Sequence, residues 1–247
     1  MYLDFSQKLN KVLDGVTKCL IIPHKNPDAD ALGSSMALSS FLTKLGKSTK
    51  IILPNSPPNY LNWMIKNHDI VSYEESPEKI KEYLLKYEII FALDFNSLKR
   101  IGILSKEIEK NNLPIVMIDH HESPEKFSTL SLSKPQIGST CELVYNVMKS
   151  INHKLIDKKI ATYIYSGILT DTGSFRFPLT SGDTHTIISE LFKKGINHTK
   201  IHEKIYDNFS LNRTRLLSIA LKNLKLIKRN VNIPEAITVR ELANRMA

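Results

Sequence analysis

Short apolar runs alternate with longer amphipathic stretches through the first 170 residues of this chain. Four runs are nearly continuous in apolar residues and are followed by polar residues or by Gly or Pro, as buried parallel strands usually are. They cover residues 19–23, 49–53, 88–94 and 114–119. Helical periodicity occupies residues 31–46, 77–86, 139–149 and 158–169. This alternation predicts an α/β fold in which a parallel β-sheet is flanked by helices.

From Ser181 onward the pattern is helical only. Helices are predicted at residues 184–194, 200–209 and 211–228, and Gly195 is a favourable C-terminal cap for the first of them. We therefore expect a core domain over residues 1–180. A helical completion with a basic linker helix should follow over residues 181–230, and a short atypical tail over residues 231–247.

The basic charge of the chain is concentrated near its C-terminus. The formal net charge is +9, and ten basic but only two acidic side chains fall within residues 193–229. The rest of the chain is close to neutral. Such a stretch is either a solvated helical face or a surface that meets phosphate, and the sequence favours neither interpretation.

Cysteine usage and hydropathy indicate where the protein works. Cys19 and Cys141 lie far apart without disulfide-like spacing, which fits a reducing compartment. The N-terminal segment lacks the apolar core of a signal peptide. No apolar run approaches the ~20 residues needed to cross a bilayer. We expect a soluble cytoplasmic protein without membrane association.

Acidic and histidine side chains follow three of the four predicted strands and one helical run. They are His24, Asp28 and Asp30 after the first strand, Asp94 after the third, Asp119, His120 and His121 after the fourth, and Asp171 at the end of the helical run. Each alone is commonly a helix cap or a hydrogen-bonded surface residue. Because ligands bind outside the carboxyl ends of parallel strands, we expect the four clusters to converge.

The residue types in these clusters favour a metal site. Carboxylates gathered at one edge of a sheet repel one another unless cations neutralise them. Oxygen ligands mixed with a few imidazoles, without thiolates, favour Mn²⁺ or Mg²⁺ over a structural zinc. Two such ions bridged by a carboxylate would suit in-line attack of a metal-activated water on phosphorus.

Four sequence motifs, in order, resemble those of the DHH phosphoesterases. The first is HKNPDADALGS at residues 24–34, the second DFNSLKRIG at 94–102, the third DHH at 119–121, and the fourth GILTDTGSF at 167–175, with GST at 138–140 between the last two. The resemblance covers roughly residues 1–225. Within the superfamily the first motif is most similar to that of the bacterial oligoribonucleases (nanoRNases) that also dephosphorylate 3′-phosphoadenosine 5′-phosphate (pAp).

The resemblance implies a role for each matching residue. Two Mn²⁺ ions are expected, with Mg²⁺ or another divalent cation as the alternative. One ion would be held by His24, Asp28 and Asp94, and the other by Asp30, Asp94, His120 and Asp171. His121 would face the scissile phosphate, with Asp119 orienting a neighbouring histidine. Arg100 would either assist the phosphate or pair with the acids, and Asn26, Ser139 and Thr140 are expected in the second shell or at the substrate, although helix capping alone would account for the last two.

The expected activity is hydrolysis of short oligoribonucleotides or pAp. Cyclic dinucleotide hydrolysis or pyrophosphatase activity from the same site is the enzymatic alternative. A truncated nucleotide- or RNA-binding module with little activity is the alternative from another class. A short RNA or a nucleotide is the expected partner, and the oligomeric state stays open, with a homodimer as one option.

The C-terminal part departs from the family pattern. These phosphoesterases usually carry a C-terminal DHHA1-type domain with a Gly-Gly-His segment, and no Gly-Gly pair follows residue 173 here. We therefore expect that domain to be absent and the grip on the substrate to be weaker. Residues 231–247 instead resemble a segment of bacterial translation initiation factor two, and an ordinary terminal helix capped by Thr238 and Glu241 is the alternative.

Overall fold

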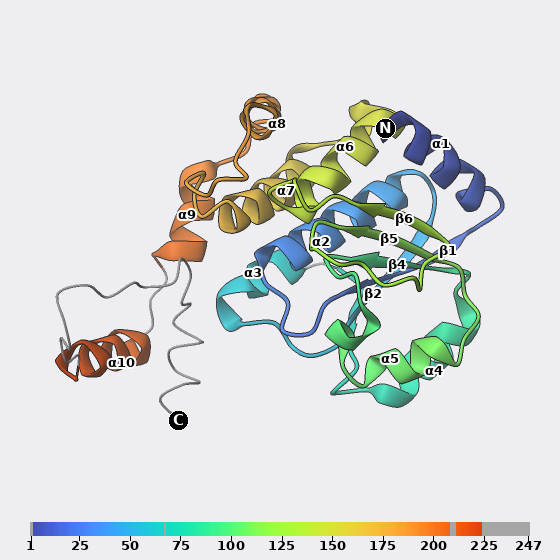
Figure 1. Cartoon of the computed structure of the whole chain (residues 1–247), viewed down its shortest axis with the longest axis horizontal. Helices are drawn as coiled ribbons and strands as arrows, with labels where there is room; N and C mark the ends of the chain where they lie inside the picture. Colours follow the sequence, from blue (N-terminus) through green and yellow to red (C-terminus); the bar gives the residue numbers. More distant parts are fainter. Residues whose placement is uncertain (1, 67, 208–210, 224–247) are drawn as a thin grey trace. The chain divides into compact units, whose positions relative to one another are not determined.

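The computed structural model describes residues 2–66, 68–207 and 211–223 (Figure 1). It divides into two compact units, Met1–Asp207 and Asn208–Ala247, which are described separately. The domain boundaries predicted at residues 180 and 230 remain predictions. The tail over residues 231–247, with its resemblance to an initiation factor, lies outside the described residues.

A six-stranded parallel sheet forms the centre of the first unit, in the order β3-β2-β1-β4-β5-β6. Its strands are β1 (Lys18–Pro23), β2 (Ser48–Leu53), β3 (Ile70–Ser72), β4 (Ile89–Leu93), β5 (Ile115–Asp119) and β6 (Leu130–Ser133). The α/β fold class is confirmed, as are the four predicted strands. The prediction missed the two edge strands, β3 and β6, which have only three and four residues.

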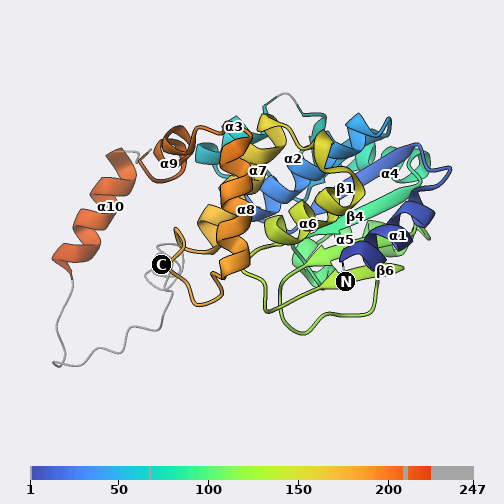
Figure 2. The ribbon, with the colours of Figure 1, turned by 90° about the horizontal axis from the view of Figure 1, so that it is seen from above.

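Helices cover both faces of this sheet (Figures 1 and 2). One face carries α1 (Tyr2–Leu13), α2 (Ala29–Lys44), α6 (Thr140–Asn152) and α7 (Lys158–Asp171), and the other carries α4 (Pro77–Lys86) and α5 (Leu104–Glu109). Successive strand residues alternate between the two cores: Ile21 and Phe91 face the larger one, whereas Leu20 and Ile90 face the smaller. Burial on both faces is the reason why these strands have continuous apolar sequences.

The remaining elements are helical. They are α3 (Asn62–Ile65), α8 (Gly182–Lys193), α9 (His198–Tyr206) and α10 (Leu211–Lys222), with short 3₁₀ turns at Asn59–Leu61, Leu98–Ile101 and His153–Leu155. Helix α10 belongs to the second unit and coincides with the first part of the helix predicted at residues 211–228, of which residues 224–228 lie outside the described residues. Helices α1, α3 and α5 were not predicted. Among the described residues, no helix combines the length and apolarity required to span a bilayer.

The strand order changes direction between β1 and β4. From β1 the chain continues toward β2 and β3, whereas β4 lies on the other side of β1 and leads to β5 and β6. The carboxyl ends of β1 and β4 therefore flank a topological switch point, which is where open α/β sheets bind their ligands. Asp28 and Asp30 follow β1, and Asp94 follows β4.

Candidate metal centre

Five elements deliver the predicted ligands to the switch point. His24 follows β1, Asp94 follows β4, and His120 follows β5. Asp28 is the N-cap of α2 and accepts hydrogen bonds of 3.0 Å from the backbone amides of Asp30 and Ala31. Asp171 is the last residue of α7. Residues that are up to 147 positions apart in sequence thus meet at one edge of the sheet.

A first group of ligand atoms lies beside β1. His24 Nε2 is 3.4 Å from Asp94 Oδ2 and 3.7 Å from Asp28 Oδ2. The three side chains offer ligand atoms that all lie within 4.8 Å of one another. The Asp94 side chain is buried, whereas that of Asp28 is half-exposed. The group is therefore open to water on the Asp28 side.

A second group lies beside β5. His120 Nε2 is 3.3 Å from Asp171 Oδ2, 3.6 Å from Asp94 Oδ1 and 4.0 Å from Asp30 Oδ2. Ligand atoms of Asp30, His120 and Asp171 again lie within 4.8 Å of one another. Because Asp94 points one oxygen at each histidine, it is the carboxylate that the two groups share.

Backbone hydrogen bonds orient the imidazole rings of both groups. His24 Nδ1 is 2.8 Å from the carbonyl oxygen of Lys25, and His120 Nδ1 is 3.1 Å from that of Ile137. When Nδ1 carries the proton and donates it to a carbonyl oxygen, Nε2 keeps a lone pair that can bind a metal, which is the usual arrangement of a metal-binding histidine. His120 Nε2 is buried without a hydrogen-bond partner. A cation between the imidazoles and the carboxylates would satisfy these atoms, so the residues fit a divalent metal.

The electrostatics of the metal-free site support the same interpretation. Burial disfavours the charged form of each histidine, but the neighbouring carboxylates outweigh burial and raise the pKa of His24 to about 11 and that of His120 to about 10. Burial and the charges of Asp28 and Asp94 raise the pKa of Asp171 to about 6, although the neighbouring His120 opposes the shift. Without metal, protons neutralise the acid cluster, and a metal would have to displace them.

Asp30 also holds the start of α6. Its Oδ2 accepts a 2.7 Å hydrogen bond from the backbone amide of Thr140, and its Oδ1 accepts one of 2.9 Å from that of Cys141. Burial and the charges of Asp171 and Asp94 raise the pKa of Asp30 well above its ordinary value. The two amide donors are the first of helix α6, so this carboxylate satisfies groups that have no partner within the helix.

The two hydroxyl residues before α6 have different partners. Ser139 is the N-cap of α6 and accepts a hydrogen bond from the amide of Glu142, as capping predicts. Thr140 Oγ1 instead donates to Asp94 Oδ1 over 2.8 Å. Thr140 thereby fixes the orientation of the carboxylate that both ligand groups share.

His121, Asp119 and Arg100 form a hydrogen-bonded chain beside Asp94. His121 Nδ1 lies 2.7 Å from Asp119 Oδ1, and Arg100 Nη2 lies 3.1 Å from His121 Nε2. His121 Nδ1 is also 3.8 Å from Asp94 Oδ1. The buried Asp119 therefore orients His121. The sequence left open whether Arg100 meets the phosphate or the acids, and in the structure Arg100 contacts His121.

Asn26 lies in the loop between His24 and Asp28 and has a partner that the sequence did not indicate. Its backbone amide donates to Asn55 Oδ1 over 2.6 Å, and Asn55 Nδ2 donates to Asn26 Oδ1 over 3.0 Å. Asn26 (φ 56°) and Asp94 (φ 64°) both adopt the left-handed conformation. Such conformations cost about 1–3 kcal/mol in non-glycine residues and tend to cluster at functional sites.

Glu142 and Gly167 support the site and were not singled out from the sequence. The Glu142 side chain is buried; its Oε2 accepts a 3.0 Å hydrogen bond from Thr184 Oγ1, and burial raises its pKa to about 7. A Cβ atom at Gly167 would lie 2.6 Å from Asp30 Oδ1. Their signal in the sequence is weak, because each acts through residues distant in the chain.

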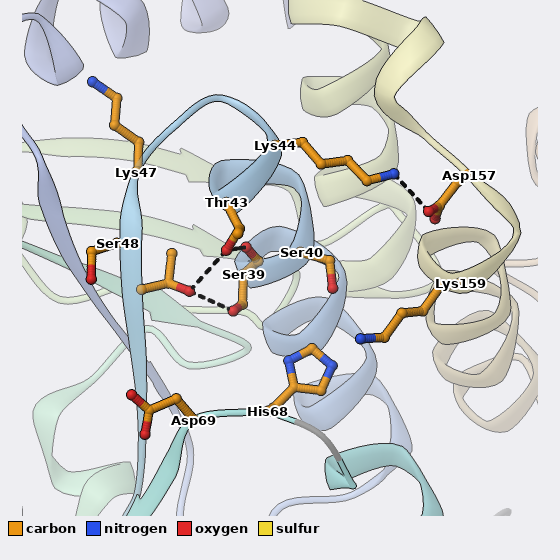
Figure 3. Close-up of a pocket in the computed structure, with 11 residues that line it drawn as sticks. Ser39, Ser40, Thr43, Lys44, Lys47, Ser48, His68, Asp69, Asp157 and Lys159 are labelled. Atoms are coloured by element: carbon orange, nitrogen blue, oxygen red, sulfur yellow. Dashed lines mark hydrogen bonds and ion pairs between the residues drawn. The ribbon is translucent and has the colours of Figure 1, made fainter.

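Another cavity, of about 430 Å³, lies at the opposite end of α2, near the start of β2 (Figure 3). Hydroxyl and lysine side chains dominate its lining. Lys44 forms a 2.6 Å ion pair with Asp157, and Lys47 donates to the carbonyl oxygens of Leu13 and Val16. Because these lysines are already paired and the cavity lies at the amino ends of the strands, we place the chemistry at the acidic centre instead.

Comparisons with known proteins show what the chain is similar to. The model of the DHH family, N-terminal domain, matches residues 18–168. The probable bifunctional oligoribonuclease and PAP phosphatase NrnA of Streptococcus mutans is 27% identical over 85% of this chain and 63% of its own length. The probable manganese-dependent inorganic pyrophosphatase of Enterococcus faecalis is 27% identical over 66% of this chain and 51% of its own.

A solved structure is similar over most of the chain. The crystal structure of an exopolyphosphatase-related protein from Bacteroides fragilis superposes with a TM-score of 0.86 and 36% identity, covering 90% of this chain and 66% of that one. This superposition agrees with the α/β fold described above. This chain spans about half to three fifths of the length of the curated relatives it matches.

Proposed function

The chain belongs to the DHH family, and we propose that it is a Mn²⁺-dependent phosphoesterase that hydrolyses short oligoribonucleotides or pAp. The proposal is carried by the two groups of ligand atoms that share Asp94, with the unpartnered Nε2 of His120 between carboxylates. The name of the S. mutans relative supports the substrate class. Manganese is supported by the name of the E. faecalis relative and by the hard oxygen ligands of the site.

We assign His24, Asp28 and Asp94 to one ion, and Asp30, Asp94, His120 and Asp171 to the other. When bound, the two cations would supply a water of lowered pKa and would neutralise charge on the phosphoryl oxygens. Mg²⁺ or another divalent cation would suit the same oxygen ligands. Asp94 is the natural bridge because its two oxygens face different histidines.

His121 and Arg100 would act on the scissile phosphate. Asp119 fixes the His121 ring through Nδ1, so Nε2 is the atom that faces outward. In the absence of substrate, Nε2 accepts a hydrogen bond from Arg100. For His121 to donate to a phosphoryl or leaving oxygen, Nε2 must carry a proton and Arg100 must move, which would place the guanidinium beside the phosphate as well.

Asp28 is the carboxylate best placed to pass a proton to solvent. Its Oδ1 is engaged by the α2 amides, but about half of its side chain is exposed. Asp30 has no exposed surface and both of its oxygens accept amide hydrogen bonds. Asp28 would therefore accept the proton of the attacking water and pass it to solvent, whereas Asp30 would stay bonded to the amides of α6.

Pyrophosphatase activity is the second candidate, favoured by the E. faecalis relative. Both reactions would use the same ligand groups, so the metal centre does not discriminate between them. Cyclic dinucleotide hydrolysis and a non-catalytic nucleotide-binding role are the further alternatives. A non-catalytic nucleotide-binding role would not require two adjoining ligand groups with one shared carboxylate.

The test is a substrate panel with matched variants. The protein would be assayed with Mn²⁺ on a diribonucleotide, pAp, pyrophosphate and a cyclic dinucleotide, beside Asp94→Asn and Asp171→Asn. Asp4→Asn is the control, since Asp4 is an exposed aspartate on α1 that forms an ion pair with Lys8. We expect turnover of the diribonucleotide or pAp, a loss of at least 100-fold in the site variants and none in the control.

A binding measurement separates metal loss from other causes. Mn²⁺ titration by calorimetry should show fewer or weaker sites in Asp94→Asn than in Asp4→Asn. Metal binding should also raise the melting temperature of the wild type, because a ligand that binds only the folded state stabilises it by mass action. Absence of Mn²⁺-dependent turnover of all four substrates would refute the enzymatic proposal.

A further inference from the structure

The loop that joins α7 to α8 has an unusual and well-fixed backbone. Gly173, Ser174 and Phe175 adopt the left-handed conformation in succession, with φ of 56°, 59° and 66°. The amide of Ser174 donates to the carbonyl of Leu169 over 2.8 Å, and the amides of Arg176 and Phe177 donate to that of Thr172 over 2.9 and 3.0 Å. These bonds hold the loop in one shape directly after Asp171.

The two phenylalanines of this loop have different environments. Phe175 is half-buried, and its ring centroid lies 6.2 Å from that of Tyr165 and 5.8 Å from that of His185. Phe177 is 46% exposed, and its ring packs on Gly173, where a Cβ atom would lie 2.5 Å from Cζ. Phe175 therefore anchors the loop, whereas Phe177 packs on Gly173 and is partly exposed to solvent.

An arginine without an acidic partner stands next to the exposed ring. Arg176 Nε donates to the carbonyl oxygen of Gly173 over 2.7 Å. Among the described residues, its guanidinium forms no ion pair, and the residue is exposed. An apolar partner that covered Phe177 would desolvate this charge without compensation, which is costly. A ligand that combines a flat ring with a negative charge has no such penalty.

The loop borders the metal centre. Thr172 Cγ2 and the carbonyl oxygen of Leu179 lie 3.4 Å from the position that a Gly138 Cβ would occupy. The neighbouring carbonyl of Ile137 accepts the hydrogen bond of His120 Nδ1. Asp171, at the other end of the loop, is 3.3 Å from His120. The loop that carries Arg176 and Phe177 therefore has Asp171, beside His120, directly before it, and it contacts Gly138 through Thr172 and Leu179.

We propose that Phe177 stacks on a nucleobase of the substrate and that Arg176 pairs with a phosphate of the same molecule, the scissile group lying at the acidic centre. The proposal rests on the proposed function, because it needs a nucleotide at that centre. Stacking on an aromatic side chain tolerates any base, since every base has a π-face. The loop would therefore select base-bearing phosphoesters over base-free ones such as pyrophosphate.

The experiment compares ligands with and without a base. Affinities for AMP and for inorganic phosphate would be measured by equilibrium dialysis with Mn²⁺ present, in the wild type, Phe177→Ala and Phe177→Trp. Phe177→Ala should weaken AMP binding about tenfold, the range of a lost base stack, and leave phosphate within twofold. Phe177→Trp should keep AMP affinity. Leu85→Ala is the control, because Leu85 is an 82% exposed side chain on α4.

Rates complete the test. On a diribonucleotide, Phe177→Ala should lower kcat/KM about tenfold, with no change on an analogue of the same phosphodiester that lacks the bases. Unchanged AMP affinity in Phe177→Ala would overturn the proposal and would indicate that another part of the protein covers the ring. Equal losses for AMP and phosphate would also overturn it, since the ring would then act on the metal centre. If the wild type shows no hydrolysis but Phe177→Ala still weakens AMP binding, only the proposed hydrolytic function is refuted.

Discussion

A methyl group added at Gly167 tests how α2, α6 and α7 hold Asp30 in place. The Cβ of Gly167→Ala would lie 2.3 Å from Cys141 Sγ, 2.6 Å from Asp30 Oδ1 and 2.9 Å from Asp30 Cα. Atoms in ordinary contact stay about 3.5 Å or more apart. Neither neighbour has exposed surface, and Asp30 is bonded to two amides of α6, so no side chain can simply rotate away.

The expected cost follows from two contributions. Overpacking of a buried position costs about 1–3 kcal/mol. Displacing Asp30 Oδ1 from the amide of Cys141 would leave this buried donor without a partner, which costs about 1–3 kcal/mol. Alanine gains about 1 kcal/mol over glycine in a helix, so the net loss in free energy of unfolding should be about 1–5 kcal/mol. Urea unfolding followed by circular dichroism in EDTA would measure it.

Two further variants make the measurement decisive. Gly182, the first residue of α8, has no atom within 4 Å of its Cβ position, so Gly182→Ala should be neutral or up to about 1 kcal/mol stabilising. Cys141→Ala removes the sulfur that the new methyl meets, so Cys141→Ala and Gly167→Ala together should be at least about 1 kcal/mol less costly than the sum of the two alone. A Gly167→Ala protein within 0.5 kcal/mol of Gly182→Ala would refute the packing argument.

Three other outcomes follow from the described contacts. Burial raises the pKa of Glu142 from 4.5 to about 7, so the folded state binds this proton more tightly and the free energy of unfolding falls as pH rises between these values. The free energy of unfolding of Glu142→Gln should therefore equal that of the wild type near pH 4.5 and exceed it by roughly 3 kcal/mol at pH 8.5, measured by urea unfolding without metal. Thr140→Val removes the hydroxyl that orients Asp94, so calorimetry should show Mn²⁺ affinity lowered about 10- to 100-fold with the melting temperature of the metal-free protein little changed. Lys44→Met removes a partly exposed ion pair with Asp157, and should change stability by less than about 1 kcal/mol and leave the rate of phosphoester hydrolysis within twofold; a larger loss of rate would give the cavity beside α2 a functional role.

The central strands could be predicted from the sequence because a strand that is buried on both faces consists of consecutive apolar residues. Residues such as Leu20 and Ile21 face different cores and are both fully buried. The edge strands have no such signature. Ile70–Ser72 and Leu130–Ser133 are short and partly exposed, and they pair with only one neighbour, so tertiary context decides their conformation.

The convergence of the ligands could be predicted for a related reason. In a parallel sheet all carboxyl ends lie at one edge, so strand-end residues such as His24, Asp94 and His120 must meet once the strands are placed. The sequence named Thr140 and Asn26 as second-shell or substrate residues but did not give the contacts of either, because each contact joins positions remote in the chain. Thr140 reaches Asp94 across 46 positions, and Asn55 reaches Asn26 across 29.

Asp30 shows why a motif does not reveal all that a residue does. From the sequence it is one carboxylate of a metal-binding set, and its oxygen lies 4.0 Å from His120. In the structure the same side chain accepts the first amides of α6 and fills the space left by Gly167. Substituting Asp30 would therefore move α6, and with it Thr140 and its bond to Asp94, as well as removing a ligand. Loss of activity in such a variant would not distinguish fold from metal binding, which is why Asp94 and Asp171 are the positions to test.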